Sequence, residues 1–342
     1  MPYAVFQGGR RRRRRFWPRR LAALAVLALV VVAIAKLLGA GDGRGGAPAP
    51  VARQPPPLPG ASFGDTGTAP LAGGGTALSP LAVRLEDPRD PIHTRFKHGP
   101  RSGLLFDIDT GRVLWRHDPT RVLPIASLTK MMTALVVTDR VARGGKVLIT
   151  KEALRYRGSG VGLLPRGKRI GVDTMLNGLL LPSGNDAAIA LAQRAGGGRV
   201  APFVGLMNAR AKQMGLLCTH YTTPSGFRDR DNHSCASDLA AIARAVLRVP
   251  RLARIVRRRQ AVLPFPIKGG KLYLYNSNPL LRMGYRGVTG LKTGFTDAAG
   301  RCLVATAKRG GVRLGVVLLH SPDPAGEAEK LLDRGFRVER HA

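Results

Sequence analysis

Three short groups of polar residues contain the side chains that are best suited to covalent chemistry. In the first, Ser127 and Lys130 are three positions apart in a segment whose apolar pattern predicts a helix. Residues at this spacing lie on the same face of a helix, so the lysine amine can lie beside the serine hydroxyl. A serine hydroxyl becomes a good nucleophile when a neighbouring base removes its proton, and a neutral lysine is such a base. The spacing suits a nucleophile and its base, but alone it is a weak signal, because chance and surface helices often produce it.

The second group, Ser183 with Asn185, lies between two apolar runs. Residues 179–182 before it are mostly leucine, and residues 186–192 after it have a helical apolar pattern. The hydroxyl and the amide are therefore predicted on a loop between two buried helices. A plain helix N-cap is the alternative for Ser183.

The third group, Lys292, Thr293 and Gly294, ends a strand-like stretch at 287–291. A glycine at a strand edge lets another backbone approach closely, and we expect Gly294 to admit a substrate there. A strand-end turn is the alternative. Lys292 adds a cation, and burial near another cation favours the neutral form of Lys130. Because each group stands in suitable local structure, a single site built from all three is the better hypothesis.

The order Ser-x-x-Lys, Ser-x-Asn, Lys-Thr-Gly is that of penicillin-binding proteins and class A β-lactamases. With its flanking residues, the sequence resembles the D-alanyl-D-alanine carboxypeptidase family more closely. These are low-molecular-weight penicillin-binding proteins, serine peptidases that trim bacterial peptidoglycan. The segments that carry the resemblance are 126–134, 182–188, 223–226, 233–238 and 290–300, within a region from about 102 to 336.

The resemblance implies acyl transfer without a cofactor. Ser127 would attack the penultimate D-alanine carbonyl of a stem pentapeptide while Lys130 takes its proton, and water would then release the acyl-enzyme. Ser183 would relay a proton to the leaving D-alanine, and Asn185 would hold the acyl-side amide. Lys292 would supply positive potential, and Thr293 would bind the terminal carboxylate. The expected catalytic residues are Ser127, Lys130, Ser183, Asn185 and Lys292, and the expected substrate-binding residues are Thr293, Gly294 and Phe295.

The backbone N–H groups of Ser127 and Phe295 are expected to form the oxyanion hole. The expected partners are peptidoglycan stem peptides and, as covalent inhibitors, β-lactam antibiotics.

The sequence departs from the family pattern at the start of the last helix, where the family commonly has an arginine that supports carboxylate recognition. Here residues 324–329 contain no arginine. Either another arginine substitutes for it or turnover is weak.

Two other classes of protein share these motifs. A class A β-lactamase deacylates through a glutamate between the second and third motifs. No glutamate lies between Asn185 and Lys292, which argues against that class. A wall-binding protein that kept the fold without activity is disfavoured by the intact motif residues, although the missing arginine leaves it open.

The N-terminal part has a different composition from the rest. Residues 10–15 are six arginines, and residues 21–35 are 15 consecutive aliphatic residues. A basic block before an apolar run is an export signal or a signal anchor, and about 20 residues span a bilayer. We expect a basic cytoplasmic segment at 1–20, a transmembrane signal anchor at 21–40 (or secretion after cleavage), a disordered Pro/Gly-rich linker at 41–98 and an extracytoplasmic catalytic domain at 99–342.

The region from 99 onward predicts an α+β fold. One hairpin is expected from 103–108 and 112–115, and another from 301–306 and 312–319, with the Lys292 strand beside it. These elements predict a β-lactamase/transpeptidase-like antiparallel sheet, built from both chain ends around a helical cluster. Helical patterns occupy 127–142, 173–181, 185–195, 202–215, 236–247 and 327–336.

The formal net charge is +34, yet the basic residues are scattered and only 5% of residues are aromatic. With no nucleic-acid-binding motif, we expect no nucleic-acid partner; an anionic envelope or a compositional bias explains the charge.

Of three cysteines, Cys218 and Cys235 can form one disulfide outside the cytoplasm, and Cys302 is expected in the core. No Cys-x-x-Cys or His-x-x-x-His pair occurs, so no metal site is expected.

Overall fold

The computed structural model describes residues 80–87, 90–227, 231–266 and 270–340. The expected cytoplasmic segment and signal anchor, and the linker as far as residue 79, lie outside the described residues. Among the helices that are described, none combines the length and the apolarity needed to cross a membrane.

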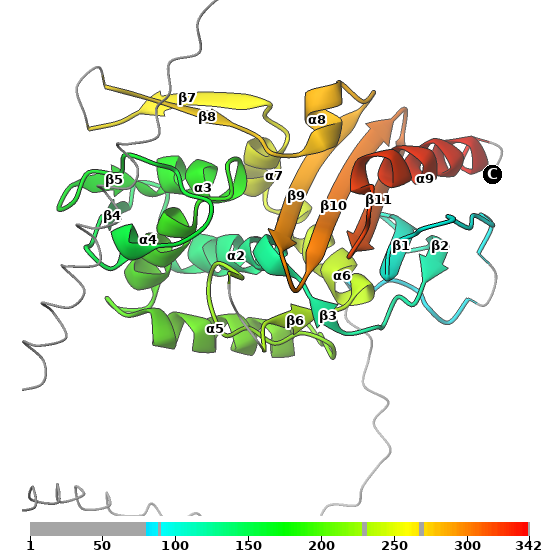
Figure 1. The fold of residues 1–342 in the computed structure, drawn as a ribbon, viewed down its shortest axis with the longest axis horizontal. Coiled ribbons are helices and arrows are strands. Elements are labelled where there is room, and N and C mark those ends of the chain that lie inside the picture. Colours follow the sequence, from blue (N-terminus) through cyan, green and yellow to red (C-terminus); the bar gives the residue numbers. More distant parts are fainter. Residues whose placement is uncertain (1–79, 88–89, 228–230, 267–269, 341–342) are drawn as a thin grey trace, which may run out of the picture. The chain divides into compact units, whose positions relative to one another are not determined.

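The main sheet of the described residues has five antiparallel strands in the order β2-β1-β11-β10-β9 (Figure 1). Pairing of β1 with β11, in which Leu104 lies opposite Val317, joins the beginning of the domain to its end. The two expected hairpins and the position of the Lys292 strand are confirmed, and that strand, β9, is an edge of the sheet. The strands are β1 (Ser102–Asp107), β2 (Val113–His117), β9 (Val288–Thr296), β10 (Gly300–Arg309) and β11 (Val312–Leu319).

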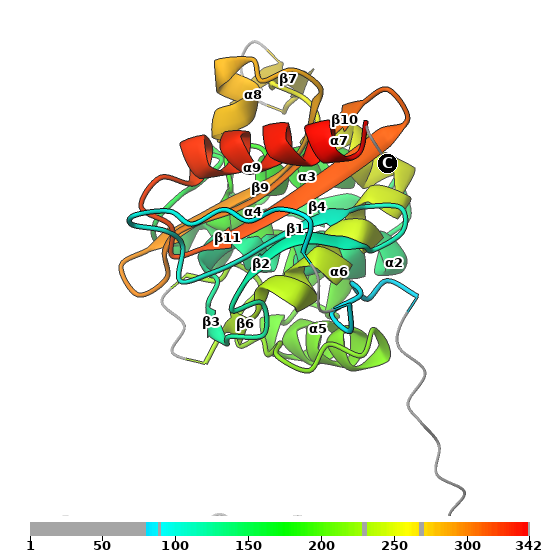
Figure 2. The same cartoon turned by 90° about the vertical axis from the view of Figure 1, so that its right-hand side faces the viewer.

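Both faces of this sheet are covered by helices. Helix α9 (Pro324–Val338) crosses one face, and α6 (Ala236–Arg248) packs on the other (Figure 2). Successive strand residues point to opposite faces, so Leu104 belongs to the core on the α6 side while Leu105 belongs to the core under α9. Burying such a side chain stabilises the fold by about 1.5–3 kcal/mol. Strands β1, β10 and β11 therefore have long stretches of consecutive buried residues.

The helical cluster lies between β2 and β9 in the sequence, as expected. Its helices begin and end within a few residues of the predicted limits, and α4 matches its prediction. Met131, Leu176 and Leu191 are fully or almost fully buried where α2, α3 and α4 meet. The cluster contains a 3-10 turn η1 (Ala126–Thr129), then α2 (Lys130–Arg140), α3 (Val172–Leu180), α4 (Asn185–Ala195), α5 (Val200–Gln213) and α6.

Several elements were not predicted. Helix α7 (Pro250–Val256) buries Leu252, Ile255 and Val256, but two arginines interrupt its apolar pattern and a run of three more follows it at 257–259. The hairpin of β7 (Gln260–Pro264) and β8 (Lys271–Tyr275) is half exposed, and only alternate residues are buried. The other additions are α8 (Pro279–Met283), η2 (Ala153–Arg155) and the short paired strands β3 (Leu123–Pro124) with β6 (His233–Ser234) and β4 (Lys146–Leu148) with β5 (Arg169–Gly171).

The described residues before β1 pack on the domain, although their composition placed them in the linker. Val83 and Ile92 are buried, and Arg84 forms a β-bridge with Arg112. The backbone N–H of Ile92 also donates to the carbonyl of Leu114. A few buried side chains are enough to hold such a segment, and composition alone does not reveal them.

A disulfide joins Cys218 to Cys235, with 5.5 Å between their Cα atoms, and Cys302 is a buried free thiol. Both expectations for the cysteines are therefore confirmed. Asp238 lies beside the disulfide, but its carboxylate accepts hydrogen bonds from the Cys218 N–H and the Thr219 hydroxyl. The disulfide closes the loop that includes residues 223–226.

Candidate active site

The first two predicted residues meet at the junction of η1 and α2. The amine of Lys130, at the first position of α2, lies 2.7 Å from the hydroxyl oxygen of Ser127. Lys130 is fully buried, because α2 is packed on nearly every side by the helical cluster. Ser127 is half-buried, so its hydroxyl remains open to a substrate. The expected contact between Lys130 and Ser127 is present.

Two further oxygen atoms hold the Lys130 amine in place. It donates to the side-chain oxygen of Asn185 and to the carbonyl of Ser225, each at 2.7 Å. Neither of these oxygens carries a hydrogen, whereas the Ser127 hydroxyl does. A neutral amine can thus donate to the two oxygens and accept the third bond from Ser127. In that form, the lone pair of the amine points at the Ser127 hydroxyl.

Asn185 connects the base to a surface loop. Its side-chain nitrogen donates to the carbonyl of Arg157 at 2.6 Å, and its backbone N–H donates to the carbonyl of Ser159. The adjacent Asp186 is buried and accepts from the N–H groups of Val161 and Ala187. Burial raises the Asp186 pKa, and these backbone hydrogen bonds oppose that rise. The second motif therefore fastens the loop that borders the site.

Ser183 has a backbone in the left-handed region, with a φ of 67°. Non-glycine residues adopt such angles at a cost of about 1–3 kcal/mol, and they concentrate at functional sites. The Ser183 hydroxyl is buried, and no described residue forms a hydrogen bond with it. An orphaned buried hydroxyl is costly, so a bound molecule that pairs with it gains affinity.

The third motif lies on the edge strand β9. Lys292 is buried, and its amine donates to the carbonyl of Thr293 at 2.7 Å. Burial lowers the Lys292 pKa to about 7. The Thr293 hydroxyl lies 2.8 Å from the hydroxyl of Ser277, a residue that the sequence analysis missed. Its only signal was the Asn-Ser-Asn-Pro turn before α8.

Gly294 brings β9 against the nucleophile. A Cβ atom on Gly294 would lie 2.9 Å from the carbonyl oxygen of Ile125 and 3.3 Å from the backbone nitrogen of Ser127. We expected Gly294 to admit a substrate backbone; the structure shows that its closest neighbour is the turn that carries Ser127. Phe295, the next residue, is 63% exposed at the open edge of the strand.

The turn at 223–226 supports the base from the other side. Besides the Ser225 carbonyl, it supplies the Pro224 carbonyl, which accepts from the Thr133 hydroxyl at 2.7 Å. Gly226 has a φ of 71°, and a Cβ there would lie 2.0 Å from the Ala126 carbonyl oxygen. This turn was noted in the sequence without a role. The structure shows that its backbone positions Lys130.

The start of α9, where the arginine is missing, serves the fold. The Asp323 side chain caps the helix by accepting from the Gly326 N–H at 3.1 Å. Glu327 is buried and accepts from the Ser321 hydroxyl at 2.6 Å. Burial raises the Glu327 pKa. The described contacts at this helix end are thus all internal.

Comparison with known proteins gives concordant results. A family model described as D-alanyl-D-alanine carboxypeptidase matches residues 91–323. The chain is 33% identical over 253 residues to D-alanyl-D-alanine carboxypeptidase DacF of Bacillus subtilis, covering 71% of this chain and 64% of that protein. It is 36% identical over 253 residues to D-alanyl-D-alanine carboxypeptidase DacB2 of Mycobacterium tuberculosis, covering 71% of this chain and 85% of that protein.

Solved structures also match. The Streptomyces K15 DD-transpeptidase superposes with a TM-score of 0.67 at 31% identity, covering 72% of this chain and all of the other. A D-alanyl-D-alanine carboxypeptidase from Mycobacterium tuberculosis gives a TM-score of 0.66 at 33% identity, covering 72% of this chain and 94% of the other.

Proposed function

Because the chain belongs to the D-alanyl-D-alanine carboxypeptidase family, we propose that it removes the terminal D-alanine from peptidoglycan stem pentapeptides through an acyl-enzyme on Ser127. The observation that carries this proposal is the position of the buried Lys130 amine, 2.7 Å from the Ser127 hydroxyl oxygen. Two fixed oxygens, from Asn185 and Ser225, orient that amine toward the serine.

Acylation begins when Lys130 takes the proton of Ser127 and the freed oxygen attacks the penultimate D-alanine carbonyl. The backbone N–H groups of Ser127 and Phe295 stabilise the oxyanion; in enzymes of this kind one such donor contributes about 10²–10³ in kcat. The orphaned Ser183 hydroxyl passes a proton to the leaving amine. The C–N bond then breaks and D-alanine departs.

The leaving residue is recognised by its carboxylate. Thr293 lies two positions before Phe295 on β9, and in this proposal its hydroxyl binds that carboxylate. Asn185 already uses both ends of its amide on Lys130 and Arg157. Its role in this proposal is therefore mainly to position the base, with substrate contact requiring the Arg157 bond to open.

Deacylation completes the reaction when water attacks the ester and Ser127 recovers its proton. A β-lactam acylates Ser127 in the same way, but its ring-opened product stays attached and blocks the site. The described site contains no glutamate between Asn185 and Lys292 that would activate a water for rapid release. β-Lactams are therefore proposed as long-lived covalent inhibitors.

The location proposed for the reaction is outside the cytoplasm. Support comes from the arginine block at 10–15, the apolar run at 21–35 and the disulfide, which is typical of oxidising compartments. An uncleaved anchor would hold the catalytic domain at the outer surface of the membrane. Protease added to wall-stripped cells should remove the domain; complete protection, or release of a soluble mature form, contradicts the anchor.

Release of D-alanine from a stem pentapeptide tests the proposed activity. The full-length protein should produce the tetrapeptide and free D-alanine, measured by mass spectrometry, and Ser127→Ala should produce neither. Retention of activity in Ser127→Ala, or inactivity of the parent protein on every stem pentapeptide, contradicts the proposal.

A further inference from the structure

Two histidines that the proposed reaction does not use, His220 and His233, lie opposite each other on antiparallel segments. The backbone N–H of each donates to the carbonyl of the other, both at 3.0 Å, and the two residues form a β-bridge. The centroids of their imidazole rings are 5.9 Å apart, and the ring planes are inclined by 32°. His220 is exposed and His233 is half-buried, so the pair lies at the surface.

The separation of the two rings is within the reach of one metal ion. An ion that binds an imidazole nitrogen at about 2.0–2.1 Å lies about 3.2 Å from the centroid of that ring, so the centroids of two ligating rings are at most about 6.4 Å apart. The observed 5.9 Å satisfies this limit. Tetrahedral coordination needs a separation nearer to about 5 Å, which a small rotation of the exposed His220 ring provides.

The segments that carry the two histidines are held together before any ion binds. The disulfide joins them two positions away from each histidine, and between the disulfide and the histidines the hydroxyls of Thr219 and Ser234 lie 2.8 Å apart. On its other side His233 belongs to β6, which pairs with β3 (Figure 1), and lies opposite Pro124. Because the backbone already fixes the two ligands, less ordering is needed when an ion binds.

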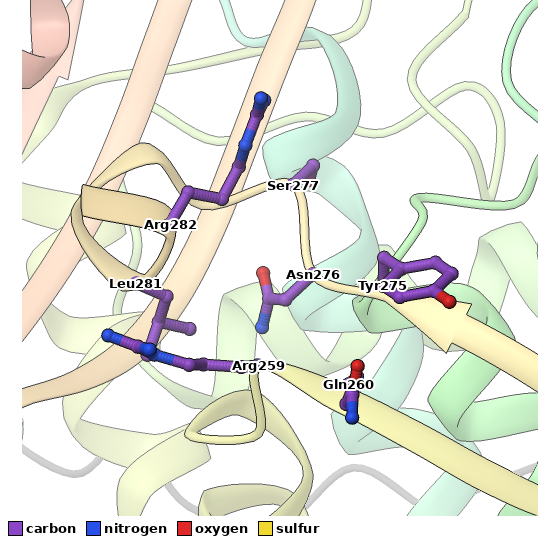
Figure 3. Close-up of a pocket in the computed structure, with 7 residues that line it drawn as sticks. All are labelled: Arg259, Gln260, Tyr275, Asn276, Ser277, Leu281 and Arg282. Carbon is purple, nitrogen blue, oxygen red and sulfur yellow. The ribbon is translucent and has the colours of Figure 1, made fainter. Parts of the chain in front are cut away.

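Two other places on the molecule are poorer candidates for a metal. Cys218, Cys235 and Asp238 bring three potential ligand atoms together, but a cysteine ligand must be a thiolate and these two sulfurs are joined in the disulfide. The hollow between the β7–β8 hairpin and α8, whose lining residues are labelled in Figure 3, contains two arginines and no histidine, cysteine or acidic side chain. The histidine pair is therefore the better site.

The chemistry of the ligands selects the kind of metal. Neutral imidazole suits Zn²⁺, Cu²⁺ and Ni²⁺, whereas Mg²⁺ and Ca²⁺ prefer oxygen ligands. Among the described residues, no carboxylate or thiol completes a group of three with the two histidines. Water therefore fills the remaining positions around the ion, and we expect an affinity in the micromolar range.

The histidine pair closes the loop that supports the proposed base. This loop runs from one histidine to the other and includes the turn at 223–226, where the Ser225 carbonyl accepts from the Lys130 amine at 2.7 Å. An ion held by both rings would cross-link the two ends of the loop, as the disulfide does two positions away. Binding should therefore stabilise the folded protein.

We propose that His220 and His233 bind one divalent transition-metal ion, for which Zn²⁺ is the probe, through one nitrogen of each neutral ring. The ion fastens the ends of the loop and takes part in no bond-breaking step, so the proposal does not depend on the proposed reaction. The sequence predicted no metal site because that expectation used only motifs of closely spaced ligands. These two histidines are far apart in the sequence and are brought together by strand pairing.

Calorimetric titration with Zn²⁺ tests the proposal on full-length protein that carries no histidine tag. The parent protein should bind one Zn²⁺, and Mg²⁺ should not bind at the same concentrations. In His220→Gln/His233→Gln the affinity for Zn²⁺ should fall by about tenfold or more. The matched control is His98→Gln/His117→Gln, which removes two exposed histidines outside the pair and should bind Zn²⁺ as the parent does.

Thermal unfolding gives a second measurement. Zn²⁺ at about 100 times its Kd should raise the unfolding midpoint of the parent and the control by about 5 °C or more, and should leave that of His220→Gln/His233→Gln unchanged. Cooperative unfolding of this double variant without Zn²⁺ shows that it is folded. If it does not fold, His220→Gln alone, which changes only an exposed side chain, should show the same loss of Zn²⁺ binding.

Three outcomes would overturn the proposal. They are the absence of Zn²⁺ binding by the parent protein, binding that survives in the variants of the histidine pair, and an equal loss of binding in the control. Labelling of Ser127 by penicillin is measured separately and does not enter this test, so the failure of the metal site leaves the proposed function standing.

Discussion

Replacing Gly294 by alanine adds one carbon atom at the point where β9 meets the nucleophile. That carbon would lie 2.9 Å from the Ile125 carbonyl oxygen, 3.2 Å from the Ala126 Cβ and 3.3 Å from the Ser127 nitrogen. The shortest of these distances is about 0.5 Å below the 3.4 Å at which ordinary contact begins. The atoms that must yield belong to η1 or β9, since Gly294 is held in the sheet opposite Cys302.

A shift of η1 moves Ser127 relative to both Lys130 and the oxyanion donors. A displacement of 1 Å can cost about 10² in rate, so a shift of about half that distance should cost about tenfold. The assay is the second-order rate constant for acylation by a fluorescent penicillin, followed on gels. Thermal unfolding should change little in comparison, because only one contact region is strained.

Gly311→Ala is the matched control. A Cβ at Gly311, in the turn between β10 and β11, has no atom within 4 Å. This variant should acylate at the parent rate. An acylation rate for Gly294→Ala within about twofold of the parent rate would refute the reasoning that this glycine sets the position of the nucleophile.

Three further predictions concern charge, the disulfide and deacylation. Because burial lowers the Lys292 pKa to about 7 from about 10.4, the charged lysine destabilises the fold by a few kcal/mol below pH 7, and this penalty declines up to about pH 10. Urea unfolding should therefore show a stability advantage of Lys292→Met that shrinks as the pH rises; an advantage independent of pH contradicts the low pKa. The Cys218→Ala/Cys235→Ala variant lacks the disulfide, whose cysteines are 17 positions apart, and its free energy of unfolding should be lower by about 3 kcal/mol. Penicillin acylation should also be slower, because the loop that the disulfide closes supplies the Ser225 carbonyl to Lys130. An unchanged acylation rate would contradict this prediction, because it would show that the turn at 223–226 keeps its position without the disulfide. The penicilloyl enzyme should persist for minutes or longer, and rapid steady-state hydrolysis of a cephalosporin would point to a β-lactamase instead.

Much of the fold could be predicted from the sequence because its helices and strands are either strongly apolar or bounded by clear turn residues. The strand pairs β1–β2 and β10–β11 are each connected by a turn that contains glycine, and α4 begins at Asn185, as its apolar pattern predicted. The hairpin β7–β8 escaped prediction although residues 271–275 alternate strictly between exposed and buried. The many arginines around this hairpin hid its alternation of apolar and polar residues, because basic residues are frequent throughout the chain.

The candidate site was predictable to the extent that side chains perform its chemistry. The spacing of Ser127 and Lys130, together with the other two motifs, predicted that they meet, and the structure brings Asn185 to the same amine. Backbone contributions were not predictable, because any residue has a carbonyl; the one from Ser225 is fixed by the path of the chain. Ser277 was missed for a related reason, since a single serine in a turn carries no pattern until β9 is placed beside it.

Peptide mapping of the acyl-enzyme tests the central claim most directly. After brief exposure of the full-length protein to a labelled penicillin, we predict one adduct, on Ser127, and none in Ser127→Ala. Lys130→Arg should also remain unlabelled, because a guanidinium cannot give up its proton to act as the base. An adduct on any other residue, or substantial labelling of Lys130→Arg, would contradict the assignment of Ser127 as nucleophile and Lys130 as its base.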